Sequence, residues 1–92
     1  MRIRFYINEL TGQPNIYDHG VGEDEVADIL GNPAEDVPGR EGSRVATGQT
    51  AAGRYLQVVY VPDPQPGSMF VITAYDLKGK PFAAFRRRRR GK

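Results

Sequence analysis

The sequence predicts a single α+β domain, with an antiparallel sheet of about four strands, a short helix packed on it, and a C-terminal basic helix or tail. Two apolar segments, residues 54–61 and 68–75, flank a proline-rich stretch at residues 62–67 and together are typical of a β-hairpin. A short segment with helical spacing lies upstream of this pair. With 92 residues, the chain has room for one modest core. We expect the domain to cover residues 1–85 and the basic tail residues 86–92.

The predicted hairpin carries apolar side chains on both faces. In its first arm Leu56 and Val58 share one face, whereas Tyr55 and Val59 share the other. Strands with two partly apolar faces usually lie at the centre of a sheet and are covered by a helix on at least one side. We therefore expect this hairpin to form the middle of the sheet.

In the N-terminal third of the chain, the pattern of apolar and polar residues predicts one strand and one helix. Residues 2–7 alternate between apolar and polar side chains, as in a strand with one buried face, and residues 8–15 contain Gly12 and Pro14 and predict a loop. In residues 23–30 the apolar residues recur at helical spacing and three acids occupy the first turn. The following Gly-Asn-Pro ends the predicted helix.

The remaining segments follow the same rules. Residues 34–43 are acidic and rich in Pro and Gly, which predicts a surface loop. Residues 44–50 predict a weak strand that forms a hairpin with residues 54–61 through a three-residue turn. Three successive antiparallel strands result. Pro81 is placed to begin a final helix that runs into the arginines.

Composition excludes several classes of protein. The chain has no cysteine, which excludes a disulfide framework and thiolate metal sites. No apolar run approaches the roughly 18 residues of a transmembrane helix, so we expect no membrane partner and a cytoplasmic protein. With a single histidine and scattered carboxylates, we expect no metal site and no cofactor.

Charge is distributed very unevenly along the chain. Residues 1–77 contain five arginines and eleven acids, whereas residues 78–92 contain eight basic residues and no acid. A polybasic end predicts a polyanionic partner, RNA or the ribosome in the first place, bound without sequence readout. The alternative is a solvated, disordered terminus. The predicted nucleic-acid-binding residues are Arg86, Arg87, Arg88, Arg89 and Arg90.

Several short motifs follow one another in a fixed order between about residues 15 and 75. They are the His19-Gly20-Val21 sequence, a short acidic helix with Val26 and Leu30, an Asn-Pro stop, the turn Gly48, Thr50, Gly53, Arg54, Tyr55 and Leu56, a Val-Val-Tyr strand and a final Ile-Thr-Ala strand. This order resembles the BrnT-type toxins, ribonuclease toxins related in fold to the RelE group. The resemblance implies metal-independent RNA cleavage and an antitoxin protein as partner.

Three residues are the candidates for this chemistry. RNA cleavage needs an acid or base, for which His19 is suited because histidine titrates near neutral pH, and a cation for the phosphate, for which we consider Arg54. Tyr75 is the candidate assisting group. Each has a structural alternative: His19 beside a helix cap, Arg54 in a salt bridge with an acid of the body, and Tyr75 as a half-buried strand aromatic.

Two positions depart from the family pattern. Asp18 and Tyr75 stand where the resemblance implies basic residues. This favours, as a second hypothesis, a non-catalytic binding module that holds nucleic acid or an acidic protein through its arginine tail. A third hypothesis is a homo-oligomer formed through an exposed sheet edge.

Overall fold

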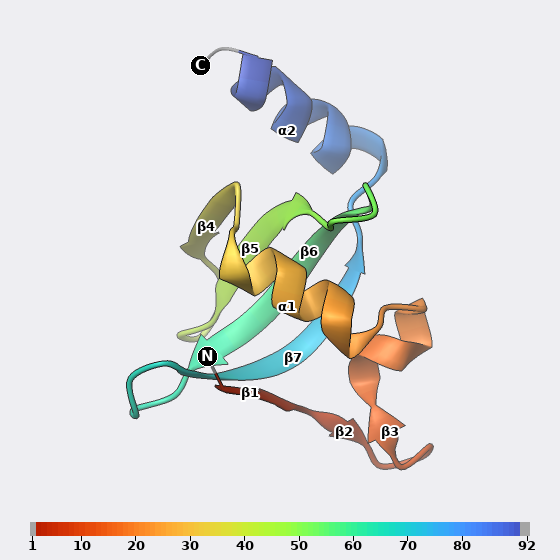
Figure 1. The fold of residues 1–92 in the computed structure, drawn as a ribbon, viewed down its shortest axis with the longest axis vertical. Helices are drawn as coiled ribbons and strands as arrows, with labels where there is room; N and C mark the ends of the chain where they lie inside the picture. Colours follow the sequence, from red (N-terminus) through yellow and green to blue (C-terminus); the bar gives the residue numbers. More distant parts are fainter. Residues whose placement is uncertain (1, 91–92) are drawn as a thin grey trace.

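The computed structural model describes residues 2–90 and has a five-stranded sheet with one helix across its face and a second helix at one end (Figure 1). The strand order is β1-β7-β6-β5-β4. A second, two-stranded sheet pairs β2 with β3. The strands are β1 (Arg2–Phe5), β2 (Ile7–Asn8), β3 (Gln13–Pro14), β4 (Glu35–Pro38), β5 (Arg44–Gln49), β6 (Tyr55–Pro62) and β7 (Ser68–Asp76), and the helices are the 3-10 helix η1 (Asn15–His19), α1 (Glu23–Gly31) and α2 (Gly79–Arg90).

The predicted hairpin is confirmed as the centre of the sheet. β6 and β7 pair antiparallel, with a bulge between Val59 and Tyr60, and β5 pairs antiparallel with β6. These three strands are the three successive antiparallel strands expected from the sequence. The α+β class and the short helix are confirmed as well.

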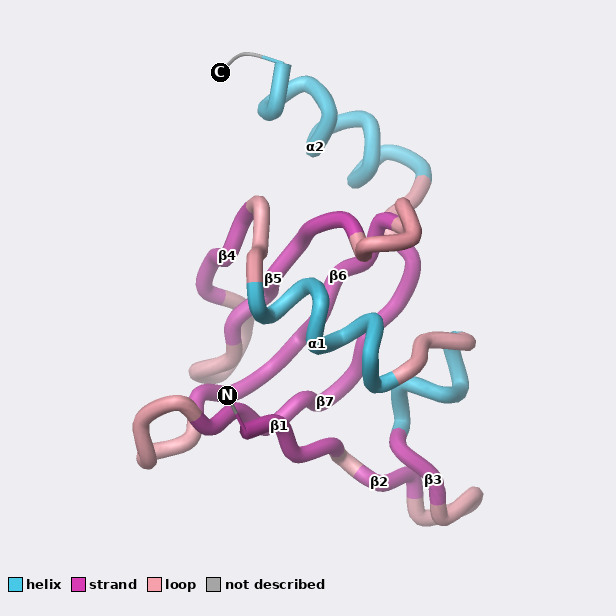
Figure 2. The backbone as a smooth tube through the Cα atoms, in the orientation of Figure 1, coloured by secondary structure: helices cyan, strands magenta, loops and turns pink. Residues whose placement is uncertain are grey.

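α1 crosses one face of the sheet (Figure 2), and the buried apolar side chains of the core come from α1 and from this sheet. Val26 and Ile29 of α1 are fully buried against apolar side chains of β5, β6 and β7. The chain after α1 packs directly on β5. A Cβ atom at Gly48 would be in van der Waals contact with it, 3.4 Å from the backbone nitrogen of Ala34 and 3.5 Å from Ile29 Cδ1. The Ala34 nitrogen donates to the Thr47 carbonyl.

The sheet has one strand more than the sequence predicted. Residues 34–43 were predicted to be a loop, and this prediction is wrong for Glu35–Pro38, which form the edge strand β4. Propensity opposes a strand there, but pairing with β5 and two side-chain contacts overcome it. Arg44 Nε donates to Asp36 at 2.8 Å, and the Tyr60 hydroxyl donates to the same carboxylate.

The sheet is also mixed rather than wholly antiparallel. β1 pairs in parallel with β7, which the chain reaches only after β2, β3, η1, α1, β4, β5 and β6. Between β1 and η1 the chain forms the short β2–β3 pair, from Ile7, which was predicted as the end of the first strand, and from residues of the predicted loop 8–15. Sequence alternation identified β1 as a strand but contained no information on its neighbour.

The C-terminal basic segment is helical up to Arg90. α2 begins at Gly79, two residues before Pro81, and continues across residue 85, where we had expected the domain to end. Phe85 is the one buried side chain of α2. Among residues 2–90, no helix is both long enough and apolar enough to cross a membrane.

α2 contacts the sheet face that α1 leaves open. Tyr55 lies on this face because its neighbour Leu56 points into the core. The ring of Tyr55 packs against Phe82 and Phe85, with centroid separations of 5.0 and 6.0 Å. These three rings attach the helix to the end of β6.

Candidate functional site

Arg54 is part of an ion-pair network rather than free for a ligand. Its Nε and Nη2 atoms donate to the two carboxylate oxygens of Asp76 at 2.7 and 3.1 Å, and Nη1 donates to Glu25 at 3.0 Å. Nη1 also donates to the Gly20 carbonyl at 2.9 Å. Of the two roles considered for Arg54 from the sequence, phosphate binding and a salt bridge, the structure has the salt bridge.

This network shifts the protonation equilibria of its members. The hydrogen bonds to Asp76 are the main reason why the pKa of Arg54 is raised above its ordinary value, and those to Glu25 add to it. The same bonds lower the pKa of the Asp76 carboxyl. Arg54 therefore connects the end of β7 with the start of α1, and two carboxylates compensate its charge.

His19 and Tyr75 come together in a cleft of about 450 Å³ at the end of η1. Their ring centroids are 6.0 Å apart, and the imidazole is exposed. Asp18, Asp76 and Lys78 complete the lining. Two of the three predicted catalytic residues thus share one site, and Arg54 lies behind it, with Nη2 at 3.5 Å from the His19 carbonyl oxygen.

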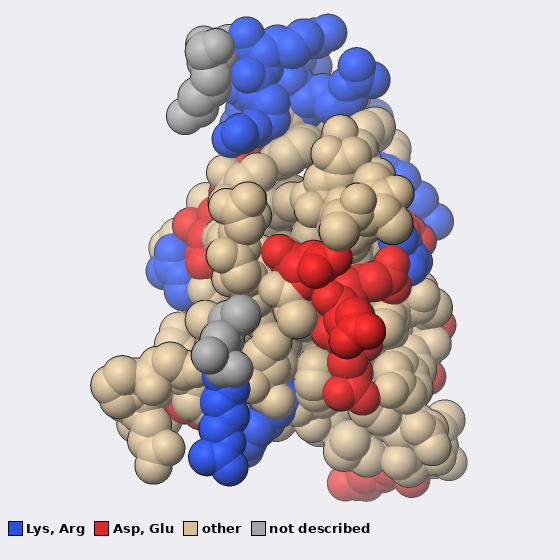
Figure 3. Space-filling view, viewed as in Figure 1, with Lys and Arg blue, Asp and Glu red and all other residues tan. Residues whose placement is uncertain are grey.

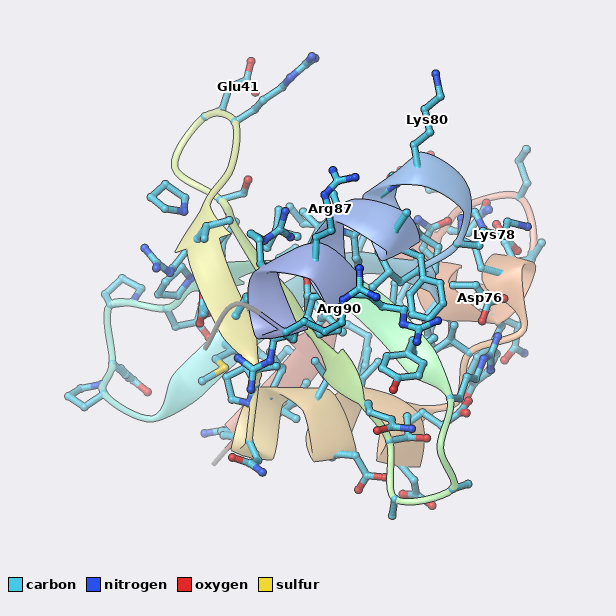
Figure 4. The ribbon with its side chains drawn as sticks, turned by 90° about the horizontal axis from the view of Figure 1, so that it is seen from above. Glu41, Asp76, Lys78, Lys80, Arg87 and Arg90 are labelled. Carbon is cyan, nitrogen blue, oxygen red and sulfur yellow. The ribbon has the colours of Figure 1, made fainter. Side chains whose placement is uncertain are left out.

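The cleft contains chemistry that sequence reasoning missed. Lys78 is its cation, and it follows β7 by two residues, beside η1 and just before α2 (Figure 4). The signal in the sequence was the change from an acidic to a basic composition at residue 78. Asp18 and Asp76 oppose this cation, so the lining is not a strongly positive phosphate site.

The most distinct electrostatic feature is a row of basic side chains along α2. Residues three, four and seven apart share a helix face, and Lys80, Arg86, Arg87 and Arg90 follow this spacing. We call these four residues the basic stripe. Arg86, Arg87 and Arg90 border a shallow hollow of about 230 Å³. Lys80 and Arg87 project on the side opposite α1 (Figure 4).

No member of the basic stripe forms an ion pair with another residue between 2 and 90. Arg86 lies over the Phe82 ring, 5.7 Å from its centroid, which orients the guanidinium without neutralising it. Four cationic groups on one helix face are thus available to a ligand.

The other two arginines of the run hold α2 on the body. Arg88 donates from Nε and Nη2 to the two carboxylate oxygens of Glu35, at 2.8 Å each. Arg89 donates from Nη1 to the Ala34 carbonyl at 3.2 Å. The five predicted nucleic-acid-binding arginines therefore divide into three that face solvent and two that contact the chain around β4.

Charge is separated over the surface of the molecule. A band of acidic side chains covers α1, and a basic cap covers α2 at the end of the long axis (Figure 3). The exposed acids of α1 are Glu23, Asp24 and Asp28. A polyanion approaching from solvent is attracted to the α2 end and repelled by the α1 face.

Among residues 2–90, no three His, Cys, Asp or Glu side chains gather at a spacing suited to a metal ion. The chain was also compared with models of protein families, with curated proteins and with solved structures. None of the three comparisons found a match. The resemblance to BrnT-type toxins therefore stays a prediction from the sequence motifs.

Proposed function

We propose that this protein is a small nucleic-acid-binding module, with RNA as the first candidate ligand, and that the basic stripe of α2 holds the phosphates. The observation that supports this most is the set of four cations on one face of an ordered helix, none of them paired within residues 2–90. Binding of phosphates by such groups releases condensed counterions and gives affinity without base readout.

The helical conformation matters to this proposal. A disordered run of arginines would lose conformational entropy on binding, whereas the stripe is already arranged on a helix attached by aromatic rings. The acidic side chains of residues 1–77 also restrict where a ligand binds, because they repel a polyanion whereas the α2 end of the molecule attracts it.

A charge-matched pair of variants tests the proposal. Arg87→Gln/Arg90→Gln removes two charges from the stripe, and Arg2→Gln/Arg40→Gln removes two from exposed arginines of the body. By fluorescence anisotropy with a labelled RNA at about 0.1 M salt, we expect the first variant to bind about 20-fold more weakly. The second should bind nearly as the wild type does. Equal losses in the two variants contradict a specific role of α2.

RNA cleavage is the second candidate function, and the shared cleft of His19 and Tyr75 favours it. In this hypothesis His19 moves the proton, Tyr75 donates a hydrogen bond, and Lys78 supplies the cation in place of the compensated Arg54. Lys78 of this cleft directly precedes α2, which carries the basic stripe. A toxin with an antitoxin partner would use the same site.

Incubation of cellular RNA with the protein and with His19→Ala tests the cleavage hypothesis. His19 is exposed, so its removal leaves the core intact. We expect the variant to cleave at least about 100-fold more slowly. Cleavage that is absent from both proteins, or equal in both, contradicts it and leaves the binding proposal unaffected.

A further inference from the structure

We infer that the nucleic acid bound by α2 is single-stranded, and that one unstacked base lies against Tyr55 in a cleft between α2 and the sheet. This inference rests on the proposed function and adds to it the class of ligand. Its basis is a cleft lined by aromatic and arginine side chains, distinct from the His19 cleft.

The cleft has about the size of a small ligand site. Its volume is about 340 Å³, near the lower end of the range of roughly 300–1,000 Å³ for ligand pockets. Tyr55 of β6, Phe85 of α2, Ala34 and Gln49 line it. A single base fits within this volume.

Tyr55 is held in a fixed orientation. The rings of Phe82 and Phe85 pack against it at 5.0 and 6.0 Å, yet Tyr55 remains partly accessible and borders the cleft. An aromatic ring fixed in this way is a stacking surface for a base, and such stacking tolerates any base because each has a π face.

Polar side chains line the same cleft as the Tyr55 ring. Arg86, Arg89 and Arg90 line it from α2, so cations and an aromatic ring border one cleft. Arg89 is anchored by the Ala34 carbonyl, and Gln49 donates its Nε2 to the Gly53 carbonyl at 3.1 Å. The Gln49 Oε1 atom accepts no hydrogen bond from residues 2–90, so it is available to accept one from the edge of a base.

A duplex fits this arrangement poorly. Its bases are stacked on one another, so their π faces are not available to Tyr55. The Arg88–Glu35 pair also holds one side of α2 against β4. This side is therefore not available to contact the walls of a duplex groove. The phosphates of a duplex would meet the stripe alone.

The test compares affinities for a single-stranded oligonucleotide and for the duplex of the same sequence. We expect the single strand to bind the wild-type protein at least about tenfold more tightly.

Variants of Tyr55 test the stacking contact itself. In Tyr55→Leu, which keeps apolar contact with Phe82 and Phe85, the affinity for the single strand should fall about tenfold and the affinity for the duplex should not change. Tyr55→Phe should bind as the wild type does. Tyr6→Leu, at an exposed tyrosine outside the cleft, is the matched control.

Photo-cross-linking of the wild-type protein to a bromouracil-substituted single strand avoids any effect of mutation on folding. We expect the cross-linked peptide to contain Tyr55. Equal affinity for single strand and duplex, or cross-links that leave Tyr55 unmodified, overturns the inference while the proposed function stands. Failure to bind either nucleic acid overturns both.

Discussion

Arg54 and Asp76 form a two-point ion pair, with Nε and Nη2 of the arginine at 2.7 and 3.1 Å from the two carboxylate oxygens. The pair joins the residue before β6 to the last residue of β7. Planar, two-point contacts of this kind depend on the guanidinium fork and are not reproduced by lysine. The same arginine also reaches Glu25, so it stabilises the junction of sheet and α1.

Arg54→Lys should therefore reduce stability without weakening nucleic-acid binding. We expect the free energy of unfolding, measured by urea denaturation, to fall by about 1–2 kcal/mol, since the network is partly exposed and its charges are screened. Unchanged stability combined with weaker RNA binding would contradict this account, because it would assign the guanidinium to a phosphate.

Asp76 makes this stabilisation dependent on pH. Its pKa is lowered in the folded state by Arg54, so the contribution is present above the ordinary carboxyl pKa of 3.8 and is lost as the pH falls through the folded-state value. Asp76→Asn should accordingly destabilise the protein at about pH 6 and have little effect at about pH 2. Glu9→Gln, at an exposed loop residue, serves as the control in urea titrations at both values. A destabilisation of the same size at both values contradicts the ion pair.

Phe85 attaches α2 to the sheet. Its side chain is 4% exposed, and it packs against Tyr55. Phe85→Ala should release the helix locally, so that the amides of α2 exchange with deuterium faster whereas those of β6 and β7 stay protected. Leu10→Ala removes a side chain that is 96% exposed and should change neither. Loss of protection throughout the sheet would contradict an attachment that is local.

Arg87 and Arg88 are adjacent but should differ in function. Arg87 belongs to the basic stripe, whereas Arg88 is bound to Glu35 by two hydrogen bonds. In the anisotropy assay at about 0.1 M salt, Arg87→Gln should bind RNA about fivefold more weakly and Arg88→Gln should change affinity much less. Equal losses would mean that the arginines act as an unstructured polycation, which contradicts the helical arrangement.

The sequence was sufficient for the parts of the fold that depend on local pattern. Alternation predicted β1 and the central hairpin, and spacing with caps predicted α1. β4 was missed, because Glu35 and Pro38 are poor strand residues, and its pairing with β5 and the Arg44–Asp36 hydrogen bond are tertiary contacts that a local pattern does not contain. The parallel partner of β1 depends on chain topology, which no short window of sequence contains.

The candidate sites show the same division. Single residues such as His19 and Tyr75 could be selected by chemistry, and they do share a cleft. The partners of Arg54 could not be chosen among eleven acids. Likewise, which arginines of the run are free and which are anchored depends on how α2 is oriented against β4, and the sequence alone does not specify this orientation.

The measurement that tests the central claim most directly is the salt dependence of RNA binding. A plot of log affinity against log salt for the wild-type protein should be linear with a slope of about −3, since four stripe cations each contribute about 0.7 for a single strand. The Arg87→Gln/Arg90→Gln variant should have a slope shallower by about 1.4. A slope near zero, or one that the variant leaves unchanged, would contradict binding through the basic stripe.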